Sequence, residues 1–212
     1  MLIAGLTGGS GSGKTTLAQQ LVAKLPEGSI CVIPMDAYYK DHGHLTRKEK
    51  LLHNFDHPDS IDFDLLNLHL RSLKMNISIE RPVYSYITCS RQSQTVVVSP
   101  AKIVLLDGLL ALSDEHLREI LDLKIFLEVS ENIRKERTIR RDMEERGRTR
   151  KAVEERFYHT VQPMHDAFIE PSKQFADIVI NGNSDDIEST TDTLKNFLLS
   201  YLQTALMHKQ HL

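Results

Sequence analysis

A glycine-rich loop close to the start of the chain has the spacing of a phosphate-binding motif. Residues 8–15 read Gly-Gly-Ser-Gly-Ser-Gly-Lys-Thr, a full match to G-x-x-x-x-G-K-[ST], with an apolar strand pattern before it and a helical pattern after it. Backbone N–H groups of such a loop surround phosphates at a helix N-terminus, where the dipole favours negative charge. Lys14 is expected to reach the β and γ phosphates, and the Thr15 hydroxyl to ligate Mg²⁺. We therefore predict a nucleotide-phosphate site rather than a flexible glycine turn, made of Gly8, Gly9, Ser10, Gly11, Ser12, Gly13, Lys14, Thr15 and Thr16.

Two aspartates follow apolar segments that suit buried strands. Asp36 comes after residues 30–35, and Asp107 comes after residues 103–106. Because ligands of open α/β sheets bind at the carboxyl ends of the strands, both acids are candidates for the site. Asp36 could accept a proton from an attacking hydroxyl and help to hold Mg²⁺, and Asp107 could assist the metal as a Walker B acid. Each could instead be an ordinary turn or cap aspartate.

Basic residues are concentrated in one predicted helix and the segment after it. Nine of the 26 Lys and Arg residues fall between positions 131 and 151. The expected i, i+4 ion pairs are Glu131/Lys135, Glu136/Arg140 and Asp142/Arg146. This leaves Arg134, Arg137 and Arg141 unpaired on one helical face, which suits the neutralisation of phosphate charge. With Gly147 as a flexible break, residues from about 131 to 155 are expected to close as a lid, the alternative being a plain solvated helix.

Residues 76–99 differ in residue pattern from the rest of the chain. β-Branched residues flank an aromatic centre, which predicts an antiparallel hairpin arm. The centre contains Tyr84, Tyr86 and Cys89, and such a strip could stack on a planar base and bond to its edge. On pattern alone, it could equally be a sheet surface or an oligomer contact.

Four histidines lie close together in the sequence, namely His42, His44, His53 and His57. The last two have helical spacing, but a proline follows them and no cysteine is near. A zinc site is therefore disfavoured, and positions on the surface or beside a substrate are favoured.

Elsewhere, strand and helix patterns alternate. Apolar runs predict buried strands at residues 2–7, 30–35, 103–106, 123–129 and 178–180. Helices are predicted at residues 14–25, 47–53, 62–73, 131–145 and 152–170, the last with a kink or break at Pro163. A terminal helix is expected to start at a capping box of Asp185 and Glu188 and to bury Leu194, Phe197, Leu198, Tyr201 and Leu202. This order predicts an α/β fold, with a parallel sheet covered by helices on both faces, in a single domain over residues 1–212.

The composition excludes several classes of protein. The 212 residues are 41% hydrophobic and 26% charged, as in ordinary globular domains. Against 26 Lys and Arg stand 29 Asp and Glu, and a net charge of −3 does not favour a general nucleic-acid coat. Cys31 and Cys89 are too few for a disulfide framework, no apolar run reaches the roughly 20 residues of a membrane span, and residues 1–6 do not resemble a signal peptide. We therefore expect a cytoplasmic protein that binds neither nucleic acid nor membrane.

Together these motifs resemble the uridine-cytidine kinase family of P-loop nucleoside kinases, over nearly the whole chain. Two strings are more specific than the phosphate loop: Asn-Phe-Asp-His-Pro at residues 54–58 and Glu-Pro-Ser-Lys at residues 170–173. The resemblance implies a P-loop fold with a hairpin substrate arm and a helical lid. It also implies Mg²⁺ as cofactor, ATP or GTP as phosphate donor, a nucleoside as acceptor, and a homo-oligomer, usually a tetramer.

The resemblance further implies roles for individual residues. Asp36 would take the proton from the nucleoside 5′-hydroxyl and lie beside Mg²⁺ with Thr15, while Asp107 stands where the family usually has a glutamate near the metal. Lys14 and Arg141 would contact the donor phosphates, Arg141 when the lid closes. The other implied contacts are Asp56 and Arg148 to the ribose, Tyr84 and Tyr86 to the base, Tyr39 beside the substrate, and Asp185 near the base of the donor.

The chain departs from this family pattern around the base. Ser85, Cys89, Thr138 and Arg156 stand where the family usually has aspartate, histidine, arginine and glutamine. Since a thiol is a weak hydrogen-bonding group, we expect Cys89 and Arg156 to alter base specificity more than catalysis. The predicted reaction is transfer of a γ-phosphate to the 5′-hydroxyl of uridine or cytidine, giving UMP or CMP in pyrimidine salvage. The alternatives are a P-loop small-molecule kinase with another acceptor, and a nucleotide-binding switch or sensor without efficient turnover.

Overall fold

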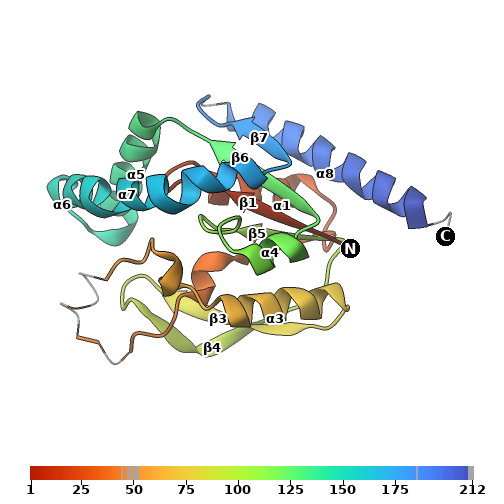
Figure 1. Cartoon of the computed structure of the whole chain (residues 1–212), viewed down its shortest axis with the longest axis horizontal. Coiled ribbons are helices and arrows are strands. Elements are labelled where there is room, and N and C mark those ends of the chain that lie inside the picture. Colours follow the sequence, from red (N-terminus) through yellow and green to blue (C-terminus); the bar gives the residue numbers. More distant parts are fainter. Residues whose placement is uncertain (44, 47–48, 50–52, 185, 210–212) are drawn as a thin grey trace.

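The computed structural model describes residues 1–43, 45, 46, 49, 53–184 and 186–209, and a five-stranded sheet lies at its centre (Figure 1). All neighbouring strands in this sheet are parallel. The order across the sheet is β2 (Ile30–Pro34), β5 (Ile103–Asp107), β1 (Leu2–Thr7), β6 (Leu123–Glu128) and β7 (Ile178–Asn181). Every residue of β1 and β5 is buried, as expected for parallel strands with both faces covered.

Helices cover both faces of the sheet, so the predicted α/β class is confirmed. Successive side chains of a strand point to opposite faces, and Leu2 and Leu6 accordingly join one hydrophobic cluster while Ile3 joins the other. The first cluster packs against α1 (Lys14–Lys24) and α8 (Ile187–Lys209), and the second against α3 (Phe63–Lys74) and α4 (Glu115–Ile120) (Figure 1). The predicted stripe of α8 is buried or packed against the first cluster, through Leu194, Phe197, Leu198, Tyr201 and Leu202.

The predicted hairpin is present and is anchored beside the end of β2. Strands β3 (Ile79–Ser85) and β4 (Ser90–Val98) are antiparallel, with a register shift between Pro82 and Tyr84. The guanidinium of Arg91 in β4 donates to the carbonyls of Tyr38 and Tyr39 and to the Asp62 carboxylate, at 2.7–3.2 Å. Asp62 also caps α3 by accepting from the Leu65 N–H. These contacts fix the hairpin to the segment that follows β2.

A run of helical turns continues from β6 to β7. Helix α5 (Glu131–Arg146) ends at Gly147, whose φ of 63° lies in the left-handed region that glycine adopts without strain. Next come α6 (Arg150–Arg156), a π turn (Phe157–Val161), α7 (Gln162–Met164), a second π turn (His165–Ile169) and a 3₁₀ helix (Glu170–Phe175). At Pro163 the helical turns are not interrupted but change type, from a π turn before α7 to a second π turn after it.

Three details differ from the sequence prediction or fall outside the described residues. Strand β2 ends at Pro34, because Met35–Tyr38 form a 3₁₀ helix. Most of the helix predicted near residues 47–53 lies outside the described residues, as does Asp185. At the start of α8, the Asp186 carboxylate accepts from the Ser189 N–H at 2.9 Å and is the observed cap. No helix in the described part of the chain has the length and apolar character to cross a membrane.

Candidate functional site

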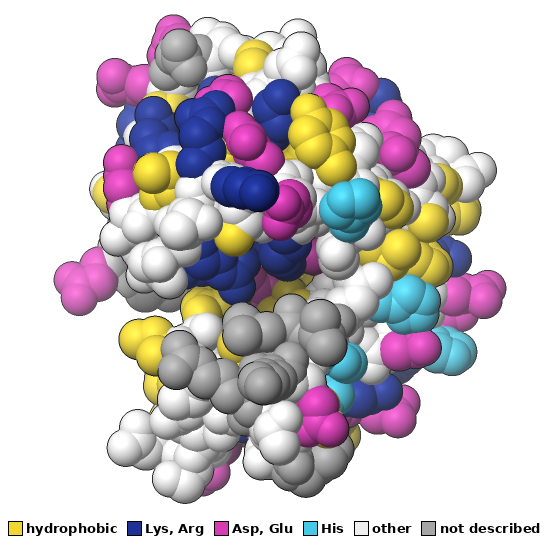
Figure 2. Space-filling model, turned by 90° about the vertical axis from the view of Figure 1, so that its left-hand side faces the viewer, with side chains coloured by type: hydrophobic (Ala, Val, Ile, Leu, Met, Phe, Trp, Pro, Cys, Tyr) yellow, Lys and Arg dark blue, Asp and Glu magenta, His cyan; other side chains and the backbone are white. Residues whose placement is uncertain are grey.

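A cavity of about 740 Å³ opens where β1, β2 and β5 end. Figure 2 shows Lys and Arg side chains gathered around the hollow on this face of the molecule. The cavity has two parts. We call residues 8–16 with Asp107 the loop half, and Tyr39, Phe55, Asp56, Tyr84 and Tyr86 the aromatic half. Residues 10–16 and all the members of the aromatic half line the cavity, so chemistry predicted separately for the two segments meets in one space.

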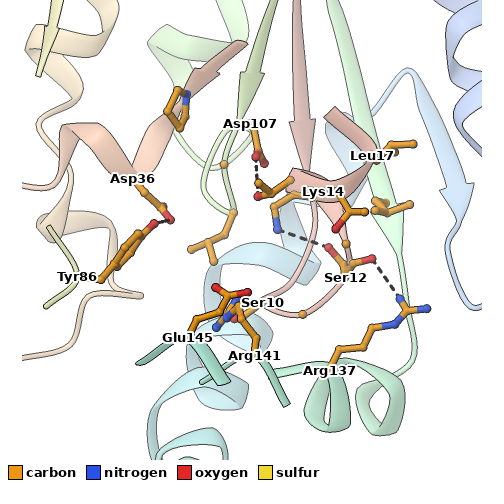
Figure 3. Close-up of a pocket in the computed structure, with 18 of the residues that line it drawn as sticks. Ser10, Ser12, Lys14, Leu17, Asp36, Tyr86, Asp107, Arg137, Arg141 and Glu145 are labelled. Carbon is orange, nitrogen blue, oxygen red and sulfur yellow. Dashed lines mark hydrogen bonds between the residues drawn. The ribbon is translucent and has the colours of Figure 1, made fainter. Parts of the chain in front are cut away.

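The loop between β1 and α1 has the shape that its glycines permit. Gly11 and Gly13 have φ values of 78° and 98°, which a side chain would strain. A Cβ at Gly11 would also stand 2.2 Å from the Arg134 carbonyl oxygen. The Lys14 ammonium lies against this loop and donates to the carbonyls of Gly8 at 2.8 Å and Gly9 at 3.1 Å. It also donates to the Ser12 hydroxyl at 3.4 Å (Figure 3).

The electrostatics of Lys14 fit an anion site. Burial lowers the pKa of Lys14, and the nearby carboxylates of Asp107 and Asp36 oppose this shift. A buried ammonium held by carbonyl oxygens gains most from a ligand with several negative oxygens. The residues present therefore fit a phosphate chain.

Two oxygen-bearing side chains meet beside Lys14. The Thr15 hydroxyl donates to an Asp107 carboxylate oxygen at 2.8 Å (Figure 3). Burial raises the pKa of Asp107, while Lys14 and the Thr15 hydroxyl act in the opposite direction. Asp36, in the 3₁₀ helix after β2, lies on the same cavity wall and is hydrogen-bonded by the Tyr86 hydroxyl (Figure 3).

Hard oxygen donors of this kind fit Mg²⁺, which usually takes one or two protein oxygens together with substrate phosphates and water. Thr15, Asp107 and Asp36 are the residues that would hold it. Within the described ranges, no three His, Cys, Asp or Glu side chains form a metal cluster, so His42, His53 and His57 form no such group; His44 lies outside those ranges.

An arginine cluster surrounds the Asp142 carboxylate, which has no exposed surface. Arg141 donates to it at 2.8 Å and Arg148 at 2.9 Å, while Arg146 and Arg156 form ion pairs with it at 3.2 Å and 3.8 Å. Burial acts to raise the pKa of Asp142, but these arginines outweigh it and the pKa is lowered. One buried acid thus holds four arginines whose positive charges line the cavity. We call Arg141, Arg146, Arg148 and Arg156 the arginine cluster.

The prediction of an unpaired face of Arg134, Arg137 and Arg141 is wrong. Arg134 is buried and donates to the Val129 carbonyl at 3.1 Å and to Gln162 at 2.8 Å, because α5 packs directly under the phosphate loop. Arg137 donates to the Ser12 carbonyl at 3.4 Å, and Arg141 is paired with Asp142.

Two of the predicted helix pairs can be compared with the structure, as can Thr138, which stands where the family usually has a base-side arginine. Asp142 pairs with Arg146 as predicted, but inside the cluster rather than in solvent. The Glu136 carboxylate is bound by Arg150 at 3.1 Å, from α6. Thr138, placed at a base-side position by the resemblance, is buried against Gly11 under the phosphate loop, on the side of α5 that faces the loop.

The aromatic half brings together three segments that are distant in sequence. The ring of Tyr39 lies 5.0 Å from that of Tyr84 and 5.5 Å from that of Phe55, between ring centroids. Asp56 is buried and accepts from Arg156 at 2.7 Å; burial raises its pKa, and Arg156 opposes the shift. The pocket therefore offers flat apolar faces beside one carboxylate, an arrangement suited to a planar ring carrying hydroxyl groups.

Nearly all the predicted site residues reach the cavity. Its lining includes Ser10, Gly11, Ser12, Gly13, Lys14, Thr15, Thr16, Asp36, Tyr39, Asp56, Tyr84, Tyr86, Cys89, Asp107, Arg141, Arg148 and Arg156. Gly8 and Gly9 contribute the carbonyls that hold Lys14, and Asp185 lies outside the described residues.

Sequence reasoning missed Phe55, Arg146 and the role of Asp142. The signal for Phe55 was its place inside the Asn-Phe-Asp-His-Pro string. Asp142 and Arg146 are predicted only as an i, i+4 ion pair. The signal for a larger cluster is the presence of two further arginines, at positions 141 and 148, close to that acid.

Known proteins resemble this chain over most of its length. A model of the phosphoribulokinase / uridine kinase family matches residues 3–188. A uridine kinase of Halalkalibacterium halodurans is 45% identical over 179 residues, which cover 84% of this chain and 85% of that protein. A uridine kinase of Alkaliphilus metalliredigens is 43% identical over 181 residues, covering 85% and 87%.

A solved structure shows a similar fold. A putative fructose transport system kinase from Silicibacter sp. TM1040 superposes with a TM-score of 0.68 at 24% identity, and the match covers 84% of this chain and 89% of that one. At this identity the likeness concerns the fold alone. With the family model, the curated relatives and the geometry of the loop half in agreement, the chain belongs to the phosphoribulokinase and uridine kinase family.

Proposed function

We propose that this protein is a nucleoside kinase that transfers the γ-phosphate of ATP or GTP to the 5′-hydroxyl of uridine or cytidine. The products would be UMP or CMP, and the role pyrimidine salvage. The observation that carries the proposal is the single cavity that joins Lys14, Asp107 and Asp36 to the aromatic half. The uridine kinases at 40–45% identity support this choice of acceptor.

In the loop half, the backbone of residues 8–16 and the Lys14 ammonium hold the donor phosphates. Phosphoryl transfer needs little covalent help, so positioning and positive charge supply most of the catalysis. Mg²⁺, when bound near Thr15, Asp107 and Asp36, would neutralise phosphate charge. Arg141 is paired with Asp142 in this structure. When negative charge develops on the transferring phosphate, Arg141 would leave that carboxylate and bond to a phosphate oxygen.

Between the two halves, Asp36 accepts the proton of the 5′-hydroxyl. Asp56 and Arg148 hold the ribose hydroxyls, and Tyr39, Tyr84 and Tyr86 contact the base. Because Arg156 already donates to Asp56, the ribose shares this carboxylate with a guanidinium. Arg156 and Cys89 line the same cavity and stand where the resemblance has base-contacting residues, so they would set base preference.

The proposal extends to the organisation of the whole molecule. Residues 1–212 act as one kinase domain, in which residues 76–99 are the substrate arm and residues from about 131 to 155 are a lid hinged at Gly147. We also infer a homo-oligomer, as the resemblance implies, and a cytoplasmic location, which suits the free thiols of Cys31 and Cys89. Its ligands are a nucleoside and a nucleoside triphosphate, not nucleic acid.

The test is a phosphorylation screen of ribonucleosides and 2′-deoxyribonucleosides, each with ATP and with GTP. We expect a 5′-monophosphate from uridine, cytidine or both, and much slower reaction of the deoxy forms, since Asp56 and Arg148 lose a partner. Phosphorylation of a non-nucleoside acceptor alone would support a different small-molecule kinase. Tight triphosphate binding without any acceptor turnover would support a nucleotide sensor.

A further inference from the structure

The Tyr86 hydroxyl is bonded to the same carboxylate, that of Asp36, to which the substrate hydroxyl would bind in the proposed reaction. Tyr86 follows β3 at the tip of the hairpin, and its hydroxyl donates to the Oδ2 atom of Asp36 (Figure 3). This is the carboxylate assigned to receive the acceptor proton. A nucleoside 5′-hydroxyl that bonds to Asp36 would make the same kind of O–H donation, so the two hydroxyls compete for one group.

Two neighbouring side chains hold the ring of Tyr86 beside Asp36. The ring packs 5.7 Å from that of Tyr84, and the guanidinium carbon of Arg146 lies 4.5 Å from its centroid. The residue is nevertheless 44% exposed, so its side chain can leave Asp36 without opening the core.

Arg146 links this contact to the arginine cluster. It stacks on Tyr86 and also bonds to Asp142, the acid that holds Arg141. Arg146 therefore contacts both Tyr86, whose hydroxyl is bonded to Asp36, and Asp142, which is also paired with Arg141.

Water is the rival acceptor that such a contact excludes. In hydrolysis the water oxygen attacks the γ-phosphorus, the bond from γ-phosphorus to the bridging oxygen breaks, and the water proton passes to Asp36. Nucleoside diphosphate and inorganic phosphate result. A carboxylate oxygen already engaged by a phenol is less able to orient that water or take its proton.

We propose that Tyr86 is a positioning residue that occupies Asp36 until a nucleoside displaces its hydroxyl, and that it thereby restrains hydrolysis of the bound triphosphate. The proposal rests on the proposed function, because it takes Asp36 as the proton acceptor. Beyond the proposed function, it assigns to Tyr86, a side chain of the hairpin, the ability to discriminate between a nucleoside hydroxyl and water as the phosphate acceptor.

The test compares two rates in three proteins: the wild type, Tyr86→Phe and Tyr158→Phe. One rate is release of inorganic phosphate from ATP without nucleoside, and the other is formation of nucleoside monophosphate with saturating nucleoside. Tyr158→Phe is the matched control, because it also removes one phenol hydrogen bond, which the Tyr158 hydroxyl accepts from Lys135 at 3.0 Å, but outside the cavity lining. The ratio of the two rates is independent of the fraction of folded enzyme, so partial misfolding does not obscure the result.

In Tyr86→Phe we expect the ratio of hydrolysis to transfer to rise about tenfold, the change that corresponds to loss of one hydrogen bond to a charged group. The nucleoside KM should not rise, since a competitor for Asp36 has been removed. A ratio within threefold of the wild type and Tyr158→Phe, or a raised KM, would overturn the role of Tyr86. If the wild type phosphorylates no ribonucleoside, the proposed function fails instead, and the hydrolysis rates alone still report on Tyr86.

Discussion

The two halves of the cavity are built in different ways. The loop half comes almost entirely from one continuous segment, residues 8–16, whose backbone makes the binding surface and whose Lys14 folds back onto Gly8 and Gly9. The aromatic half is assembled from side chains of separate segments, joined by ring contacts and by the Asp56–Arg156 ion pair. A surface made of local backbone tolerates little variation, whereas one made of side chains can change its ligand by substitution. We therefore expect catalysis to depend on the first half and specificity on the second.

The largest effect is expected in the loop half, at Lys14. Lys14→Met should lower kcat/KM for the triphosphate about 10³-fold, because it removes a positive charge aimed at the transferring phosphate. It should not lower the unfolding midpoint, since burial already disfavours the charged form of Lys14. Lys24→Met, at the end of α1 where Lys24 pairs with Asp192 of α8 at 2.8 Å, is the control and should retain activity. Steady-state kinetics and thermal unfolding measure both effects; retained turnover in Lys14→Met would contradict the assignment.

Asp36 stands between the halves, and its replacement separates chemistry from binding. Asp36→Asn should lower kcat about 10²-fold, because an amide cannot accept the proton of the acceptor hydroxyl. Binding of the triphosphate, measured by calorimetry, should change little. Asp41→Asn, an exposed acid five residues on that bonds to the Gly43 N–H, should behave as the wild type. Normal turnover in Asp36→Asn would remove it from the catalytic role.

Asp142 tests whether the arginine cluster depends on its buried acid. Asp142→Asn should lower kcat about tenfold and destabilise the protein by about 3 kcal/mol at pH 7, since it leaves several arginines without a counter-charge. The pKa of Asp142 is lowered in the folded protein, so its stabilisation is present above the ordinary carboxyl pKa of 3.8 and is lost as the pH falls below that value.

Unfolding of Asp142→Asn should accordingly lose part of its pH dependence below about pH 4, where a depressed carboxyl pKa contributes. Glu136→Gln, which affects the exposed pair with Arg150, is the control and should change stability by less than about 1 kcal/mol. Equal effects of the two variants would show that the cluster is no more than a surface network.

The smallest effect belongs to the aromatic half, at Cys89. Its thiol donates to the Tyr86 carbonyl at 3.4 Å and offers a base only weak hydrogen bonds. Cys89→His should raise kcat/KM for uridine about threefold, by supplying a stronger hydrogen-bonding group. The φ of 48° at this position is no worse for histidine than for cysteine. Cys31→Ala, remote from the cavity lining, is the control; an unchanged or lower value in Cys89→His would show that the base is recognised elsewhere.

The difference between the halves also explains which parts of the structure the sequence predicts. The phosphate loop, the parallel strands and the hairpin follow from local patterns, such as the glycine spacing of residues 8–13 and the β-branched residues that flank the aromatic centre of residues 76–99. Asp36 and Asp107 could be placed as well, because the ends of parallel strands share one edge of a sheet.

Long-range packing decides what the sequence could not predict. Arg134, Arg137 and Arg141 share a helical face, but α5 lies against the phosphate loop, so that Arg134 is buried and Asp142 becomes the centre of a cluster. Neither the Asp56–Arg156 pair, 100 positions apart, nor the hydrogen bond from Tyr86 to Asp36 has a local signal. Contacts of this kind depend on how hairpin, lid and sheet meet, which spacing along the chain does not encode.

The most direct measurement is a crystal structure of the complex with uridine or cytidine and a non-hydrolysable triphosphate. The account predicts the phosphates on the backbone of residues 8–16 beside Lys14, with the nucleoside 5′-oxygen within hydrogen-bonding distance of Asp36, about 3 Å. Tyr86 should have left that carboxylate. A 5′-oxygen bound away from Asp36, or a triphosphate bound elsewhere than on the loop half, would contradict the account.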